Sequence, residues 1–158
     1  MKRRRLLAAL ALLPAGLARA LAQEITHAQP ELAKQKLTIV THDGKQHVFD
    51  VEIAKTPEQQ TVGLMFRPSV PADGGMLFDW GAPKQSQMWM RNTIAPLDML
   101  FISADGTIRH IAEDTVPQSL AVIDSGGPVR ATLEIAAGTA ERLDIRVGDK
   151  VLSPALGS

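Results

Sequence analysis

The sequence predicts a mainly β fold with minor α content: a compact antiparallel β-barrel or sandwich that carries one or two short helices. Short segments in which apolar residues alternate with polar ones recur along the chain. Turn sequences rich in Gly, Asp and Pro separate these segments, and helix-start signals are few. We therefore expect a sheet that closes on itself and is plugged by the short helices.

Residues 1–22 are typical of a secretory signal peptide. A basic tip, MKRRR, precedes an apolar segment and a small-x-small cleavage site, ALA (20–22) or ARA (18–20). Proline, glycine and arginine interrupt this segment, which is short of the roughly 20 apolar residues that a spanning helix needs. We predict cleavage, no stable membrane span afterwards, and a periplasmic or secreted protein. The string RRRLL (3–7) also resembles a twin-arginine signal, so two export routes stay open.

Charge and composition exclude several classes of function. Residues 1–22 hold five of the 17 basic residues and none of the 17 acidic ones, which leaves 12 basic and 17 acidic residues and a formal charge of −5. Such an acidic domain has no electrostatic footprint for nucleic acid, so we expect no nucleic-acid partner. The chain has no cysteine, which excludes disulfides, thiolate metal sites and a cysteine nucleophile.

Residues 23–36 are polar and are interpreted as an N-terminal arm, followed by a single β-rich domain over residues 37–154. The first two strands of that domain are predicted at Leu37–Val40 and Gln46–Ile53, on either side of the turn HDGK (42–45). In the second strand, apolar and polar residues alternate, which is typical of a half-buried strand.

The period changes in KTPEQQTVG (55–63), where we predict a short helix. Thr56 suits the N-cap, Pro57 suits the first helical position, and Gln59 completes a capping box. Gly63 and Pro68 keep the helix short. Further strands are predicted at Met76–Trp80, Gln87–Arg91, Leu97–Ser103, Ile108–Glu113, Ala131–Ile135 and around Lys150–Leu152, with a loop over Pro117–Pro128 and a helical turn that Thr139 opens.

Six motifs make the chain resemble the domain of unknown function 192 family, a group of small, often exported bacterial and archaeal proteins. They are GLMFR (63–67), GMLF (75–78), WMRNTIAPLDMLFI (89–102), DGTI (105–108), LEIAAG (133–138) and GDKV (148–151). The resemblance runs from about residue 37 to 152, and its central block is specific. It implies a small β-rich domain and little about activity.

The stretch MWMRNTIAPLDMLFI (88–102) raises the main question about function, because polar residues are set into an apolar wall. Strand alternation puts Asp98 on the same face as Leu100 and Ile102. A buried carboxylate needs a partner, and we expect Arg91, Arg67 or several backbone N–H groups to supply it. In one interpretation Asp98 only ties down the Asn92–Pro96 loop. In the other, a pocket is lined by Trp89, Arg91, Asn92, Thr93 and Asp98.

Arg67 and Glu134 form a second candidate pair. Glu134 lies between Leu133 and Ile135 in a predicted strand, so it projects to the opposite face. If that face is solvent, which is the default expectation, Glu134 is an ordinary exposed residue. If it points inward, it joins Arg67 and Asp98 in one polar cluster, where two carboxylates form an acid/base pair.

Methionines suggest a copper(I) site, which we regard as the weaker interpretation. Thioethers are soft ligands, but methionine is also an adaptable core residue. The histidines show no closely spaced set that favours a closed metal site. We therefore predict no metal and no cofactor.

Three function classes follow from these residues. The first is an exported binding or accessory domain that recognises a small polar or anionic molecule, because the planar arginine fork suits carboxylate or phosphate. The second is a hydrolase that uses Asp98 or Glu134 as acid or base. The third is a structural component of an envelope assembly without a ligand.

Overall fold

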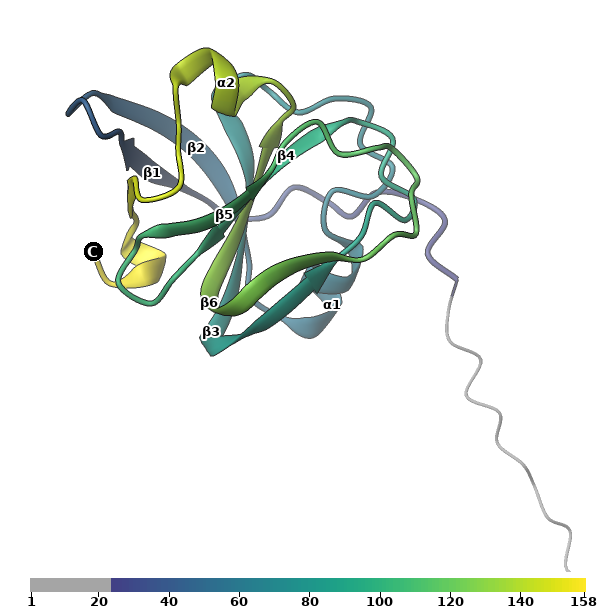
Figure 1. Cartoon of the computed structure of the whole chain (residues 1–158). Coiled ribbons are helices and arrows are strands. Elements are labelled where there is room, and N and C mark those ends of the chain that lie inside the picture. Colours follow the sequence, from purple (N-terminus) through teal and green to yellow (C-terminus); the bar gives the residue numbers. More distant parts are fainter. Residues whose placement is uncertain (1–23) are drawn as a thin grey trace, which may run out of the picture.

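The computed structural model describes residues 24–158, and the predicted signal peptide lies outside them (Figure 1). The elements in chain order are β1 (Lys34–Val40), β2 (Gln46–Ala54), α1 (Pro57–Val62), β3 (Gly74–Met88), β4 (Leu97–Ile102), β5 (Ile108–Ala112), β6 (Ile123–Ala136), α2 (Thr139–Leu143), β7 (Lys150–Leu152) and a 3₁₀ turn, Pro154–Leu156. Within residues 24–158, no helix has the length and apolar character needed to cross a bilayer.

All seven of these strands belong to one sheet in the order β5-β4-β6-β3-β2-β1-β7. The neighbouring strands are antiparallel except for β2 and β3, which are parallel because the chain crosses over through α1 between them. The sheet curls until its two edges meet: Thr107 bridges to Lys150, and the Ile108 N–H donates to the Asp149 carbonyl at 2.9 Å. The predicted fold, mainly β with short helices, is confirmed.

Two hydrophobic clusters lie on the two faces of this sheet. One is enclosed by the curl, since it joins residues of β1, β5 and β7, and it includes Ala140 and Ile145, so that α2 and the segment after it plug one end. The other cluster covers the opposite face and is made of Ala54, Leu64, Met76, Phe78, Met90, Leu97, Met99, Phe101 and Val129. Figure 1 shows α1 at the other end of the sheet from α2.

The start of α1 follows the sequence prediction. The Thr56 hydroxyl accepts from the Gln59 N–H at 3.2 Å, and the Gln59 side chain accepts from the Thr56 N–H at 3.1 Å, which is a complete capping box. The N-terminal arm is tied to this helix, because the Gln29 amide donates to the carbonyl oxygens of Gln59 and Gly63.

Three predicted boundaries are wrong. The predicted strand Met76–Trp80 and the first two residues of the predicted strand Gln87–Arg91 belong to a single strand, β3, which ends at Met88 and whose pairing with β6 is interrupted by irregularities. The predicted loop Pro117–Pro128 ends early, since β6 already begins at Ile123. Ile123 and Asp124 pair with the end of β3, and at the irregularity beside them the Ser125 hydroxyl accepts from the Ser86 N–H at 2.9 Å. Likewise β1 begins at Lys34, inside the predicted arm.

Candidate functional site

A row of directly paired residues crosses the outer face of the sheet and sets the geometry of the candidate site. Glu52 on β2 pairs with Met76 on β3, Met76 pairs with Glu134 on β6, and Glu134 pairs with Met99 on β4. Paired residues share a face, so two glutamates lie on the apolar side that holds the second hydrophobic cluster. Both are buried, with 5% of Glu52 and 4% of Glu134 exposed. The default expectation of an exposed Glu134 is therefore wrong.

Glu52 is neutralised by Arg67. The guanidinium nitrogens of Arg67 donate to both Glu52 carboxylate oxygens at 3.1 and 3.2 Å, and the Leu32 N–H donates to the same carboxylate at 2.7 Å. Arg67 is thus engaged with Glu52, whereas the sequence suggested Asp98 or Glu134 as its partner. Glu52 was missed because the alternation of β2 placed it on the polar face, which the arm in fact covers.

Asp98 is fully buried on the opposite face of the sheet, paired with Ile135. Its carboxylate accepts three backbone N–H bonds: from Asp114 at 3.0 Å, Gly138 at 3.3 Å and Ala140 at 2.9 Å. The expectation of a carboxylate held by hydrogen-bond donors is confirmed, and the donors are backbone groups rather than arginine. Asp98 therefore fixes the segment after β5 and the start of α2.

Asn92 and Thr93 form the turn that the sequence indicated. Asn92 adopts a left-handed conformation with φ of 54°, and its carbonyl accepts from the Phe66 N–H at 2.9 Å. The Thr93 carbonyl accepts from the Gln118 N–H at 3.0 Å. The turn thus joins the exit of α1 to the loop 113–122, while the Asn92 amide only approaches the Met65 sulfur at 3.9 Å.

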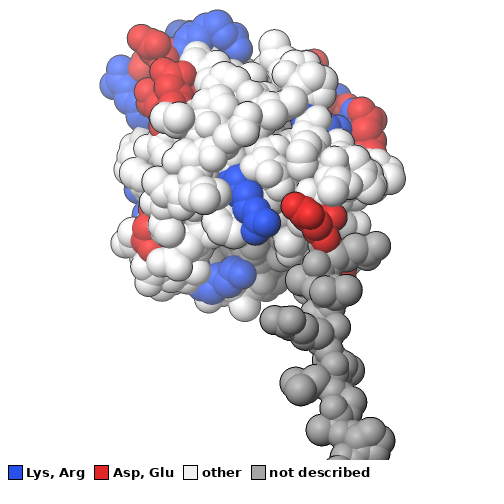
Figure 2. Space-filling view, turned by 90° about the vertical axis from the view of Figure 1, so that its right-hand side faces the viewer, with Lys and Arg blue, Asp and Glu red and all other residues white. Residues whose placement is uncertain are grey.

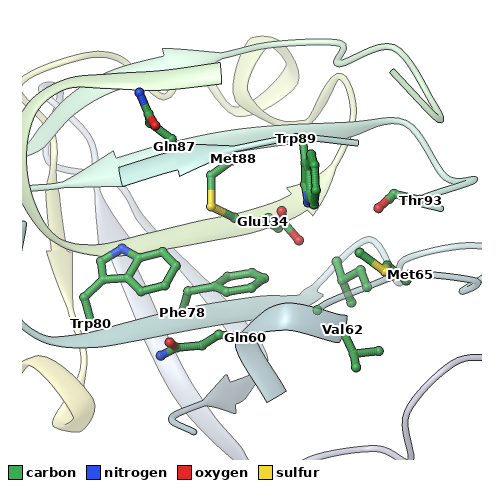
Figure 3. Close-up of a pocket in the computed structure, with 12 residues that line it drawn as sticks. Gln60, Val62, Met65, Phe78, Trp80, Gln87, Met88, Trp89, Thr93 and Glu134 are labelled. Carbon is green, nitrogen blue, oxygen red and sulfur yellow. The ribbon is translucent and has the colours of Figure 1, made fainter. Parts of the chain in front are cut away.

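A cavity of about 120 Å³ lies beneath this turn, between α1, β3 and β6. Figure 3 shows the carboxyl group of Glu134 directed into it, next to Met88, Trp89 and Phe78. Among the described residues, the carboxyl group of Glu134 takes part in no hydrogen bond, and its oxygens are accessible from the cavity rather than fully enclosed. The lining consists of Gln60, Val62, Gly63, Leu64, Met65, Phe78, Trp80, Gln87, Met88, Trp89, Thr93 and Glu134.

Burial raises the pKa of Glu134 to about 8. The carboxyl group sits among apolar and aromatic side chains, where the charged form loses its hydration. Arg67 does not offset this effect, because it is paired with Glu52, which lies two strands away from Glu134 on the same face. Glu134 is therefore mostly protonated at neutral pH.

The rim of the cavity is exposed and aromatic. Trp89 is 45% exposed, and the Arg91 guanidinium lies over its ring at 5.4 Å from the centroid. The Lys84 ammonium lies over the Trp80 ring at 4.1 Å. Figure 2 shows the side of the molecule that carries the loop 113–122, where charged side chains are sparse; the exposed apolar residues of that loop are Val116, Leu120 and Val122.

The structure thus separates the predicted site residues into two groups. Trp89, Thr93 and Glu134 line the cavity, and Arg91 stands at its rim. The remaining three, Arg67, Asn92 and Asp98, make structural contacts elsewhere. The sequence analysis did not assign Phe78 and Trp80 to the site, although both follow Met76 at alternating positions of one strand and therefore share its face.

The methionines divide between core and cavity. Met76, Met90 and Met99 are fully buried in the second hydrophobic cluster, whereas Met65 and Met88 line the cavity. Within residues 24–158, no group of three or more His, Asp or Glu side chains is arranged to hold a metal ion.

Comparison with known families agrees with the motifs. The family DUF192, described as Uncharacterized ACR, matches residues 38–153. The chain belongs to the DUF192 family. No curated protein matches the sequence of this DUF192 domain.

Two crystal structures resemble this DUF192 domain closely. A putative transcription regulator from Sinorhizobium meliloti 1021 is 45% identical with a TM-score of 0.78, over 81% of this chain and 99% of that one. A protein of unknown function from Novosphingobium aromaticivorans DSM 12444 is 37% identical with a TM-score of 0.75, over 82% of this chain and 94% of that one. In both crystal structures, the part that resembles this domain makes up nearly the whole chain.

Proposed function

We propose that this chain is a small-molecule-binding domain whose ligand occupies the Glu134 cavity. The observation that carries the proposal is the buried carboxyl group, which faces an aromatic-lined space without a partner among the described residues. Buried polar groups are normally hydrogen-bonded, and an unpartnered one calls for an explanation. A ligand that bonds to Glu134 supplies that partner.

The site supports a small polar ligand and disfavours an anionic one. Recognition of an anion was expected from arginines, but Arg67 is bound to Glu52, and Arg91 lies on the surface over Trp89. An anion in the cavity finds no free arginine there, and above the pKa of Glu134 it is repelled by the ionised carboxyl group. The ligand we propose places a polar group at Glu134 and an apolar body against Phe78 and Trp89.

A binding role accounts for the residues better than hydrolysis does. Asp98 and Glu134 lie on opposite faces of the sheet, so they do not form an acid/base pair. The cavity lining holds no His, Lys, Asp or second Glu that would activate water beside Glu134. The enzyme hypothesis that remains is that Glu134 acts alone as a general acid, which a hydrolase assay can test.

Filling the cavity is expected to abolish ligand binding. Trp80 and Trp89 are the two tryptophans of the chain, and both line the cavity, so intrinsic fluorescence reports its occupancy. A panel of small amines, alcohols, amides and carboxylates is titrated against the domain and against Met88→Phe, whose ring occupies the space. Met88→Leu preserves the volume and serves as the control. Equal responses in all three proteins contradict the proposed site.

We propose further that the domain acts outside the cytoplasm, on the basis of residues 1–22. Expression of the full chain in a bacterial host is expected to give periplasmic protein that starts near residue 21 or 23, as measured by intact-mass spectrometry of cell fractions. A chain without residues 1–22 is the control and is expected in the cytoplasm. Uncleaved protein in the membrane fraction contradicts export by this route.

A further inference from the structure

We infer that the Glu134 cavity takes a small alkylammonium group, free or at the end of a longer molecule, in preference to an alcohol or a carboxylate of the same shape. This inference rests on the proposed binding function and names the ligand class. Three features of the lining support it: the hydrogen-bonding capacity, the aromatic faces and the size.

The polar side chains of the lining offer acceptors, because most of their donor hydrogens are already used. The Gln60 amide nitrogen donates to the carbonyl oxygens of Asp79 at 2.7 Å and Ala54 at 3.2 Å. The Gln87 amide nitrogen donates to Asp124 at 3.1 Å, and the Thr93 hydroxyl donates to the Arg91 carbonyl at 3.3 Å.

What stays available in the lining is a set of oxygen atoms. The side-chain oxygens of Gln60, Gln87 and Thr93 accept no hydrogen bond from the described residues, and once Glu134 is ionised both of its carboxyl oxygens are acceptors as well. Trp89 is the exception among the described lining residues, since its indole N–H donates to none of them, whereas the indole N–H of Trp80 donates to Thr132 at 3.2 Å. An ammonium group brings several donors and no acceptor, and it therefore complements this lining.

The aromatic residues favour a cation as well. Phe78, Trp80 and Trp89 surround Glu134 in the view of Figure 3. Ring faces attract cations, and in this protein Lys84 and Arg91 already lie over the two indole rings. Both of these cations are exposed to solvent, which screens their repulsion of an incoming ammonium group.

The size of the cavity limits the ligand to a few heavy atoms. An apolar cavity of about 150 Å³ holds benzene, and this one measures about 120 Å³. A methylated or branched alkylammonium group has a volume of that order.

The test compares three molecules of nearly equal shape: tert-butylammonium, tert-butanol and pivalate. Binding is measured by tryptophan fluorescence and by NMR shifts of the Glu134 and Trp89 amides at pH 9, where Glu134 is ionised. We expect tert-butylammonium to bind about tenfold or more tightly than tert-butanol, because the ammonium forms a charge-assisted hydrogen bond. Pivalate is expected not to bind. Glu134→Gln is expected to remove the preference for the cation and to keep the weak binding of tert-butanol.

The pH dependence gives an independent readout. Burial raises the pKa of Glu134 to about 8, so ammonium affinity is expected to rise about tenfold per pH unit from pH 6 to 8 and to level off above it. The other charged groups around this face are the Glu52–Arg67 pair, Lys84, Arg91, Asp124, which accepts from the Gln87 side chain and whose lowered pKa keeps it ionised, and His110, which stacks on Phe101. Because histidine side chains change charge in this range, His110→Gln is the control and is expected to keep the same profile.

The possible outcomes separate the two proposals. If tert-butanol or pivalate binds as tightly as tert-butylammonium, the cation inference is wrong and the cavity stays a ligand site. If none of the three binds and Nα-acetyl-lysine amide does not bind either, both proposals fail. A further arm uses Nα-acetyl-lysine amide: binding by this compound and not by tert-butylammonium assigns the site to a lysine side chain of a partner, whereas the reverse assigns it to a free amine.

Discussion

Replacing Asp98 by alanine is expected to lower the free energy of unfolding by about 3 kcal/mol or more. The substitution leaves the buried Ala140 N–H and the part-buried N–H groups of Asp114 and Gly138 without their acceptor. It also removes the anchor that joins the segment after β5 to the start of α2. Urea unfolding followed by circular dichroism measures the loss.

Two further variants make this prediction specific. Asp98→Asn keeps the shape but presents amide hydrogens to backbone donors, so it is expected to lose a substantial part of the same stability. Asp50→Asn on β2 is the matched control, because that carboxylate pairs with Lys36 at the surface and its loss is expected to change stability by less than about 0.5 kcal/mol. Wild-type stability of both Asp98 variants contradicts the structural role.

Replacing Glu134 by glutamine is expected to make the protein less sensitive to alkaline pH. The folded state holds the Glu134 proton up to a pKa of about 8, whereas the unfolded chain releases it near the ordinary value of 4.5. Between these values the unfolded state binds fewer protons, so wild-type stability falls as pH rises, by about 1.4 kcal/mol per pH unit. The contribution of this carboxyl group is complete below pH 4.5 and lost above pH 8.

The measurement is the difference between wild type and Glu134→Gln in urea unfolding from pH 5 to pH 9. The free energy of unfolding of the variant, relative to that of the wild type, is expected to rise by about 4 kcal/mol in total across this range. Groups that titrate in both proteins cancel in the difference. Glu58→Gln is the control, since that residue is exposed on α1 and its pKa is lowered rather than raised. Parallel stability curves for wild type and Glu134→Gln contradict the burial of an unpartnered carboxyl group.

Local patterns account for the parts of the fold that the sequence predicted well. The helix start at Thr56 depends on residues within one turn, and its capping box is present as expected. The strand around Asp98 alternates as predicted, so that Leu97, Met99 and Phe101 face one hydrophobic cluster while Leu100 and Ile102 face the other. The alternation of apolar residues along a strand and the capping of a helix depend only on residues close together in the sequence, so the sequence alone predicts them.

The candidate site depended on contacts that no local pattern contains. The sequence predicted that Glu134 and Glu52 are exposed, but a distant segment of the chain buries each of them. Glu134 is covered by α1 and the turn at Asn92, and Glu52 is covered by the N-terminal arm. The pairing of Arg67 with Glu52 likewise depends on tertiary structure, because the segment after α1 brings Arg67 to a residue of β2 fifteen positions earlier in the chain. Such pairings are decided by the whole sheet.

By itself, the sequence determined the fold class, the capped helix and the buried position of Asp98, because alternation and capping act over a few residues. The tertiary structure decided which carboxyl group faces a cavity. The curl of the sheet placed Asp98 against backbone donors and Glu134 against aromatic rings, so that two acids of similar local sequence received opposite surroundings. Burial and hydrogen bonding, which set the chemistry of an acid, are properties of its neighbours in space.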